Sequence, residues 1–301
     1  MRSSPVLGHD GDVSTVRRSR PRRGPALVAA VLLGALAAGC APQSDVERLD
    51  EASTVSPETR AAADRFVELL DDVDQTVAVD QQVAVSARET AAAVAGETLL
   101  GSQARAFLEA HVTQVQRDTQ AAAPVSAAVE VVTVAEAHDA DDPVAVVTVD
   151  TVRTAQDSRA TTVRAAYAVS WDVPSAAQGE APEGLRLTAV RAVHDDDGHL
   201  AVADPTAGSS VLGVATGYVS ALRSGSTHDV DAYEGGVRSS TDLRDAMRAR
   251  LAASGRSTAV EVPCGRTGPV QLVYVVLDGD VPPLRLEVDV SGPEPVVNAY
   301  L

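Results

Sequence analysis

Residues Val144–Thr154, VAVVTVDTVRT, have the composition and the pattern of a buried β-strand. Most of its residues are β-branched, and branched side chains favour strands over helices. Alternate residues point to opposite faces of a strand. One face carries Val144, Val146 and Thr148, and the other carries Ala145, Val147 and Val149. Both faces are fairly apolar, so we expect a strand with one face against helices.

Further segments with a period of two surround this strand. They are Ala128–Ala137, Thr161–Val173, Leu185–His194 and His199–Val202. Breaks with turn-forming residues separate them, and most are short enough for antiparallel neighbours. The longer break, Ser175–Gly184, predicts a loop at one end of the sheet. Trp171 is the only tryptophan, and we interpret it as a core or rim anchor.

The residues before the sheet follow a helical period. Apolar residues at i, i+3, i+4, i+7 and i+11 form one stripe: Phe66, Leu69, Leu70, Val73 and Val77. This pattern predicts an amphipathic helix that starts near Thr59. The acidic residues between them, including Asp71 and Asp74, are interpreted as a solvated face. A second helix is expected from Ser102 to just before Pro124.

The same order of elements occurs again after the predicted linker Thr206–Ser210. Two helices are expected after Val211 and after Ser240. Four strands follow them, at Thr258–Val262, Val270–Leu277, Leu284–Val290 and Val296–Tyr300. Helices followed by a meander of strands predict an α+β fold with helices on one face of each antiparallel sheet. We therefore expect two domains, residues 59–205 and 211–301.

Two segments resemble parts of NTF2-like proteins. Tyr218–Gly225, YVSALRSG, is similar to the usual ending of their first helix, and Leu185–Pro205 is similar to their last hairpin. This resemblance implies that helices pack into a curved sheet and form a cone. A cystatin-like unit of sheet and helix fits the pattern as well. Both folds host several functions, so the resemblance implies no particular activity.

The N-terminal region has the order of an export signal. Five arginines between Arg17 and Arg23 precede Pro25–Cys40, PALVAAVLLGALAAGC. The 15 residues before the cysteine carry no charge. As a helix they would span roughly 22 Å, which is shorter than the hydrocarbon core of about 30 Å. A cleaved signal is therefore favoured over a permanent span.

Leu36–Cys40, LAAGC, resembles the lipobox of bacterial lipoproteins. The resemblance implies that the Cys40 thiol receives a diacylglycerol and that cleavage falls between Gly39 and Cys40. Residues 1–39 would then be the signal peptide, and residues 40–58 a lipidated N-terminus with a flexible tether. The expected location is the extracytoplasmic face of the cell membrane. Cys264, the other cysteine, is then left without a disulfide partner and is interpreted as a small buried residue.

The composition limits the classes of partner. All 25 basic residues are arginine, and the formal net charge is −17. The absence of lysine and isoleucine is typical of GC-rich genomes, such as those of actinobacteria. Removal of residues 1–39 leaves 19 arginines and 40 acidic residues, a charge of −21. Nucleic acid would be repelled by such a chain, so we expect no nucleic-acid partner.

No motif predicts a specific reaction. His138–Asp139, His194–Asp195 and His228–Asp229 form adjacent pairs, which we interpret as turn and cap residues. His111 is the titratable residue on a predicted apolar stripe, and we interpret it as a core or rim histidine. We assign no catalytic, cofactor-binding or metal-binding residue, and we expect no cofactor.

The expected function is that of a lipid-anchored envelope protein, a non-catalytic module for interaction or assembly with an envelope protein partner. Two alternatives remain open at this stage. One is a carrier or sensor that holds an apolar small molecule or lipid in a cone-shaped pocket. The other is an NTF2-like enzyme that uses His111 or a buried aspartate for acid–base chemistry.

Overall fold

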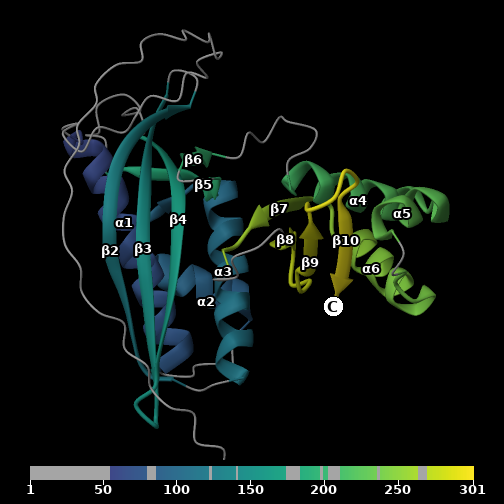
Figure 1. The fold of residues 1–301 in the computed structure, drawn as a ribbon, viewed down its shortest axis with the longest axis horizontal. Coiled ribbons are helices and arrows are strands. Elements are labelled where there is room, and N and C mark those ends of the chain that lie inside the picture. Colours follow the sequence, from purple (N-terminus) through teal and green to yellow (C-terminus); the bar gives the residue numbers. More distant parts are fainter. Residues whose placement is uncertain are drawn as a thin grey trace, which may run out of the picture. The chain divides into compact units, whose positions relative to one another are not determined.

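A computed structural model describes most of the chain after the predicted tether. The described residues are 55–79, 86–121, 124–139, 142–173, 184–196, 199–202, 211–235, 238–263 and 270–301. Residues Leu49–Leu301 form one compact unit, which contains two sheets (Figure 1). Helices and mainly antiparallel strands make the fold α+β, as predicted.

Four helical elements of the described residues precede the long strands of the first sheet, and the two that were predicted begin near Thr59 and at Ser102. The four elements are α1 (Pro57–Val73), the π-helix η1 (Asp74–Val79), α2 (Ala87–Ala95) and α3 (Ser102–Ala121). The Ser56 side chain caps α1, because its oxygen accepts a hydrogen bond from the Thr59 backbone N–H. The apolar stripe from Phe66 to Val77 is buried, so the predicted helical face is confirmed.

The first sheet has the strand order β1-β5-β4-β3-β2, with β6 paired to β5. Its strands are β1 (Leu99–Leu100), β2 (Pro124–Asp139), β3 (Asp142–Ala155), β4 (Ala160–Asp172), β5 (Arg186–Asp196) and β6 (His199–Val202). All pairs are antiparallel except β1 with β5. The predicted segments are confirmed, but the two-residue β1 is too short to show a period and was not predicted.

Val144–Thr154 lies in β3, between β2 and β4. Its residues Ala145, Val147 and Val149 pack in the same core as Phe66 of α1 and Phe107 of α3. The expected contact of one face with the helices is therefore confirmed. Trp171 on β4 is only partly buried and packs at the edge of this core, so it is a rim anchor.

The start of α3 is attached to β5. The Gly101 N–H donates to the Leu187 carbonyl at 2.8 Å, in line with the β1–β5 pairing. The Gln103 side-chain amide donates to the Val190 carbonyl and accepts from the Val190 N–H, both at 2.7 Å. A Cβ at position 101 would lie 2.8 Å from the Thr188 carbonyl oxygen, so glycine permits this close approach.

The second sheet is an antiparallel meander in the order β7-β8-β9-β10, as predicted. Its strands are β7 (Ser257–Glu261), β8 (Val270–Leu277), β9 (Leu284–Asp289) and β10 (Val296–Tyr300). The helices before it are α4 (Val211–Ser224), α5 (Thr227–Glu234) and α6 (Thr241–Ala253). The helices expected after Val211 and after Ser240 are confirmed as α4 and α6, and Ser240 caps α6.

Strand β8 is covered on both faces, which differs from the prediction of helices on one face only. Val273, Val275 and Leu277 pack in a core with α4 and α6. Leu272, Tyr274 and Val276 join the core of the first sheet, to which α3 belongs. A run of apolar residues such as Val270–Leu277 is typical of a strand buried on both sides. The predicted boundary between residues 205 and 211 stays a prediction.

Candidate functional site

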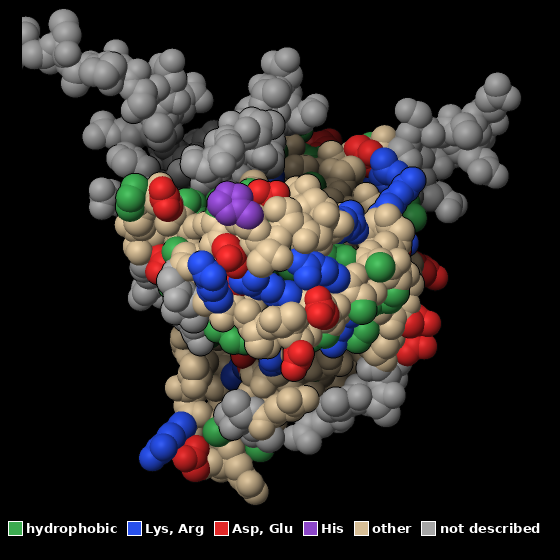
Figure 2. Space-filling model, turned by 90° about the vertical axis from the view of Figure 1, so that its right-hand side faces the viewer, with side chains coloured by type: hydrophobic (Ala, Val, Ile, Leu, Met, Phe, Trp, Pro, Cys, Tyr) green, Lys and Arg blue, Asp and Glu red, His purple; other side chains and the backbone are tan. Residues whose placement is uncertain are grey.

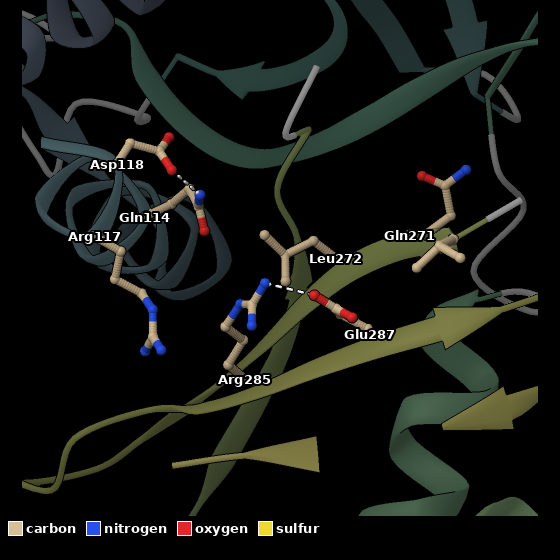
Figure 3. Close-up of a pocket in the computed structure, with 8 residues that line it drawn as sticks. Gln114, Arg117, Asp118, Gln271, Leu272, Arg285 and Glu287 are labelled. Carbon is tan, nitrogen blue, oxygen red and sulfur yellow. Dashed lines mark hydrogen bonds and ion pairs between the residues drawn. The ribbon is translucent and has the colours of Figure 1, made fainter. Parts of the chain in front are cut away.

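A polar pocket of about 200 Å³ lies beside the C-terminal half of α3 and the strands β8 and β9 (Figure 3). Its lining is mainly polar, in contrast to the valine-rich cores on either side of β8. The residues are Gln114, Arg117, Asp118, Val270, Gln271, Leu272, Arg285 and Glu287. Because these side chains come from three separate elements, the pocket depends on the tertiary fold.

Local periodicity places the lining side chains. Gln114, Arg117 and Asp118 are spaced i, i+3 and i+4 along α3, so they share one face of the helix. Along β9, the burial alternates, and its inward residues pack against the second core. Arg285 and Glu287 are two residues apart and therefore point to the opposite face, toward the pocket.

A row of side chains across three strands organises the floor of the pocket. Tyr274, Arg285 and Tyr300 are register partners on β8, β9 and β10. The Arg285 guanidinium lies 4.9 Å from the centroid of the Tyr300 ring and pairs with Glu287 at 2.6 Å. Cation–π contact and ion pairing therefore hold this guanidinium in place.

The floor is also joined to α3. The Tyr274 hydroxyl lies 2.8 Å from Oε1 of Gln114 and donates to it. Burial raises the pKa of the Tyr274 hydroxyl to about 12, so the hydroxyl stays protonated as a donor at neutral pH. Gln114 in turn donates to Asp118 at 2.7 Å. This chain of contacts positions the polar face of α3 over β8.

The pocket offers two guanidinium groups, two carboxylates and two amides. Arg117 is exposed, and no ion pair is recorded for it in the described part of the chain. Its charge is therefore available to a carboxylate or phosphate group. No group of histidine, cysteine or carboxylate side chains that could hold a metal ion occurs among the described residues. The arrangement suits recognition by hydrogen bonds and charge.

His111 lies in the core rather than in this pocket. Its ring stacks on Phe107 with a centroid distance of 5.9 Å, and the residue is 8% exposed. Among the described residues, neither ring nitrogen has a hydrogen-bond partner. Burial, and to a smaller extent the nearby Arg153, lower the pKa of His111 to about 3. The imidazole is therefore neutral at pH 7, as expected for a core histidine.

A buried ion pair lies near His111. Asp74, 1% exposed, sits at the start of η1 and pairs with Arg153 of β3 at 2.7 Å. Burial raises the pKa of Asp74, although Arg153 opposes this. Arg153 also lies 3.4 Å from Asp118 on α3. The pair thus joins the α1–η1 helix to the sheet.

The interpretation of the acidic run as a solvated face was wrong for Asp74. It was also wrong for Asp71, whose carboxylate accepts the backbone N–H of Val129 at 3.1 Å. The missed signal was not local, because the partners Arg153 and Val129 are more than 50 residues away in the sequence. The change from α-helix to π-helix at Asp74 does not correspond to any pattern in the sequence either.

The remaining candidates of the sequence lie apart from the pocket or outside the described residues. His228 and Asp229 are exposed in the first turn of α5, where Ser226 rather than Asp229 is the cap. The side chains of the pairs at 138–139 and 194–195 are outside the described residues, as are Cys40 and Cys264. No described helix combines the length and the apolar character that a membrane span requires.

Replacement of His111 by leucine is expected to protect the protein against acid. Wild-type stability should fall as the pH drops from 6.5 toward 3. In this range His111 binds a proton in the unfolded state but stays neutral in the folded state. At pH 4 this loss amounts to about 3 kcal/mol, at 1.36 kcal/mol per pKa unit. Urea denaturation of both proteins between pH 4 and 8 measures it. His228→Leu is the matched control, and equal pH profiles for all three proteins would contradict the buried, neutral state of His111.

No protein-family model, curated protein or solved structure matches this chain. The side chains of the described residues, together with the N-terminal sequence, are therefore the basis for assigning a function.

Proposed function

We propose that this protein is a lipid-anchored protein of the cell envelope and that its folded unit is a non-catalytic module for interaction or assembly. Cys40 carries the lipid after cleavage behind Gly39, and the residues between Cys40 and the helix cap Ser56 tether the folded unit at the extracytoplasmic face of the membrane, which shortens the predicted tether because α1 already begins at Pro57. The basic cluster, the short apolar run and the LAAGC ending support this anchor. The α+β unit then presents its surface to an envelope protein partner.

The filled helix-facing side of the first sheet is the observation that carries the non-catalytic part of this proposal. Phe66, Phe107 and Tyr167 meet there with ring centroids 5.0 to 6.0 Å apart. All three side chains are buried, as are the valines of β3 behind them. A carrier or enzyme with the ligand inside the cone would need open space at this place. The packing therefore favours a module that acts through its surface.

The order of elements in the first half supports an NTF2-like assignment. Three helices precede a sheet of long antiparallel strands, and those helices pack on one of its sides. The pairing of β5 with β6 corresponds to the last hairpin that the sequence resembles. The second half repeats the order of helices and then strands, in a smaller form.

The surface chemistry favours a protein partner. Figure 2 shows the face to which α5 and α6 belong, where arginine and carboxylate side chains lie side by side. Two ion pairs of this region lie at the surface: Arg238 with Asp231, and Arg248 with Asp245. Alternating charges of both signs match the polar rim of a protein interface better than a polyanion. The polar pocket adds the charge of the exposed Arg117.

Cross-linking in intact cells tests this function. The full chain is expected to form a specific cross-link with one envelope protein, and Arg117→Glu should lower the yield at least fivefold. Arg159→Glu, which changes an exposed arginine outside the pocket lining, should leave the yield unchanged. Cys40→Ala should abolish labelling by an alkyne fatty acid. Normal acyl labelling of Cys40→Ala would contradict the anchor, and equal cross-linking by all variants would contradict the role of the pocket.

A further inference from the structure

An apolar groove of about 550 Å³ lies between α2 and α3, apart from the polar pocket. Small side chains of α2 and the segment after it make one wall, and the first turns of α3 make the other. The lining residues are Arg88, Ala91, Ala92, Ala95, Gly96, Thr98, Leu100, Arg105 and Glu109. The volume is within the range of about 300–1,000 Å³ that is usual for small-molecule sites.

The sequence of α2 explains why the groove is open. The helix turns alanines toward α3, where leucine or phenylalanine would fill the space between two packed helices. Its ends are well fixed, because Ser86 and Glu89 form a reciprocal capping box and Gly96 caps the C-terminus. The groove is thus held open by an anchored helix with small side chains.

The polar residues of the groove are mainly cationic. The Arg88 guanidinium lies 3.3 Å from the Glu109 carboxylate and also donates to the Leu277 carbonyl at 3.3 Å. Arg105 is exposed, and no ion pair is recorded for it in the described ranges. The charged residues that line the groove are two arginines and one glutamate, and the Asp278 carboxylate lies near enough to interact with Glu109.

A further polar atom in the groove lacks a partner. The Thr98 hydroxyl oxygen is buried, and among the described residues it has no hydrogen-bond partner. A buried hydroxyl without a partner costs free energy. Thr98 thus adds a polar residue to a lining that is otherwise mainly small and apolar on this side.

We propose that the α2–α3 groove binds a fatty carboxylate, with its alkyl chain against the alanines and its carboxylate beside Arg105 and Arg88. The alanine wall fits a slender alkyl chain, and each methylene removed from water adds favourable free energy. The charge of the arginines selects an anionic head over a cationic one. This site lies outside the filled interior of the first sheet, and it does not depend on the proposed interaction function.

Photolabelling of the full chain tests this site. The protein is incorporated into phosphatidylcholine nanodiscs and titrated with a photoreactive hexadecanoic acid, and labelled peptides are identified by mass spectrometry. Saturable labelling of the peptide Glu89–Arg105 is expected. Ala92→Leu fills the groove from an exposed position that should tolerate it, and Arg105→Glu reverses the charge. Each variant should raise the fatty-acid concentration at half-saturation at least tenfold, whereas Arg159→Glu should leave it unchanged.

Three outcomes would overturn the proposal. They are labelling that does not saturate, labelling that neither groove variant weakens, and equal labelling by a photoreactive hexadecyl trimethylammonium ion. Circular dichroism melting of each variant shows whether it remains folded. A loss of fatty-acid binding with intact cross-linking to the envelope partner would separate this groove from the polar pocket. Failure of the cross-link with intact labelling would count against the interaction function alone.

Discussion

Replacement of Phe107 by alanine is expected to lower the free energy of unfolding by about 3–5 kcal/mol, the usual cost of removing a buried phenylalanine. Phe107 is 1% exposed and contacts Phe66, Tyr167 and His111 through its ring. Its helix, α3, packs against the first sheet and also against β8. The loss should therefore affect both sheets.

Hydrogen exchange followed by mass spectrometry measures where the loss appears. The Phe107→Ala variant should show faster exchange in β3 and in β8 by a similar factor, because α3 contributes to the core that both strands share. Val132→Ala, a change at an exposed position of β2, is the matched control and should remain within 0.5 kcal/mol of the wild type. Unchanged protection of β8 would instead indicate two independently stable domains, divided as the sequence predicts.

Replacement of Glu234 by alanine is expected to cost about 3–5 kcal/mol, the usual effect of removing one partner of a buried ion pair. Glu234 is fully buried at the end of α5. It accepts from the Tyr218 hydroxyl at 2.8 Å and from the Ser239 N–H at 2.7 Å, and it pairs with Arg244. Without it, Asp231 is the ion-pair partner that remains for the buried Arg244 among the described residues.

The pH dependence of this effect has a defined sign. Burial alone would raise the pKa of Glu234, but the hydrogen bonds from Arg244, Tyr218 and Ser239 outweigh it and lower the pKa below 4.5. The ionised group therefore adds stability above about pH 4.5, and this contribution is lost as the pH falls through the folded pKa. The difference between Glu234→Ala and wild type should shrink in acid.

Urea denaturation at pH 7 and pH 3 measures both parts of this prediction. Asp245→Ala removes an exposed carboxylate that pairs with Arg248, and it should cost less than about 1 kcal/mol at either pH. A loss for Glu234→Ala that is no larger than for Asp245→Ala would show that the buried network contributes little. A loss that stays constant with pH would contradict the lowered pKa of Glu234.

Local patterns were sufficient for most of the secondary structure. The β-branched run Val144–Thr154 formed β3, and the stripe from Phe66 to Val77 formed the buried face of α1 and η1. These features depend on side-chain branching and periodicity within a few residues, which a sequence displays directly. Strand β1 and the π-helix at Asp74 show no such period. Their contacts are with residues distant in the sequence, in β5 and β3.

The candidate sites required contacts between distant residues. Arg117 and Arg285 reach the same pocket from α3 and β9, and no motif links positions so far apart in the chain. Likewise, the groove arises where the alanines of α2 meet the first turns of α3. In the sequence, nothing distinguishes Asp74 from the other residues of the acidic run. Its burial and its ion pair with Arg153 of β3 are visible only in the folded structure.

The sequence alone was sufficient to predict the α+β class, the order of most helices and strands, and a core or rim position for His111. These features were predictable because the hydrophobic period and the side-chain branching that produce them involve residues close together in the sequence. The tertiary structure was needed to show that α3 packs against both sheets, that Asp74 is buried, and where the polar pocket and the groove lie. These features depend on which segments, distant in the sequence, pack together. That packing is determined by many contacts across the whole fold.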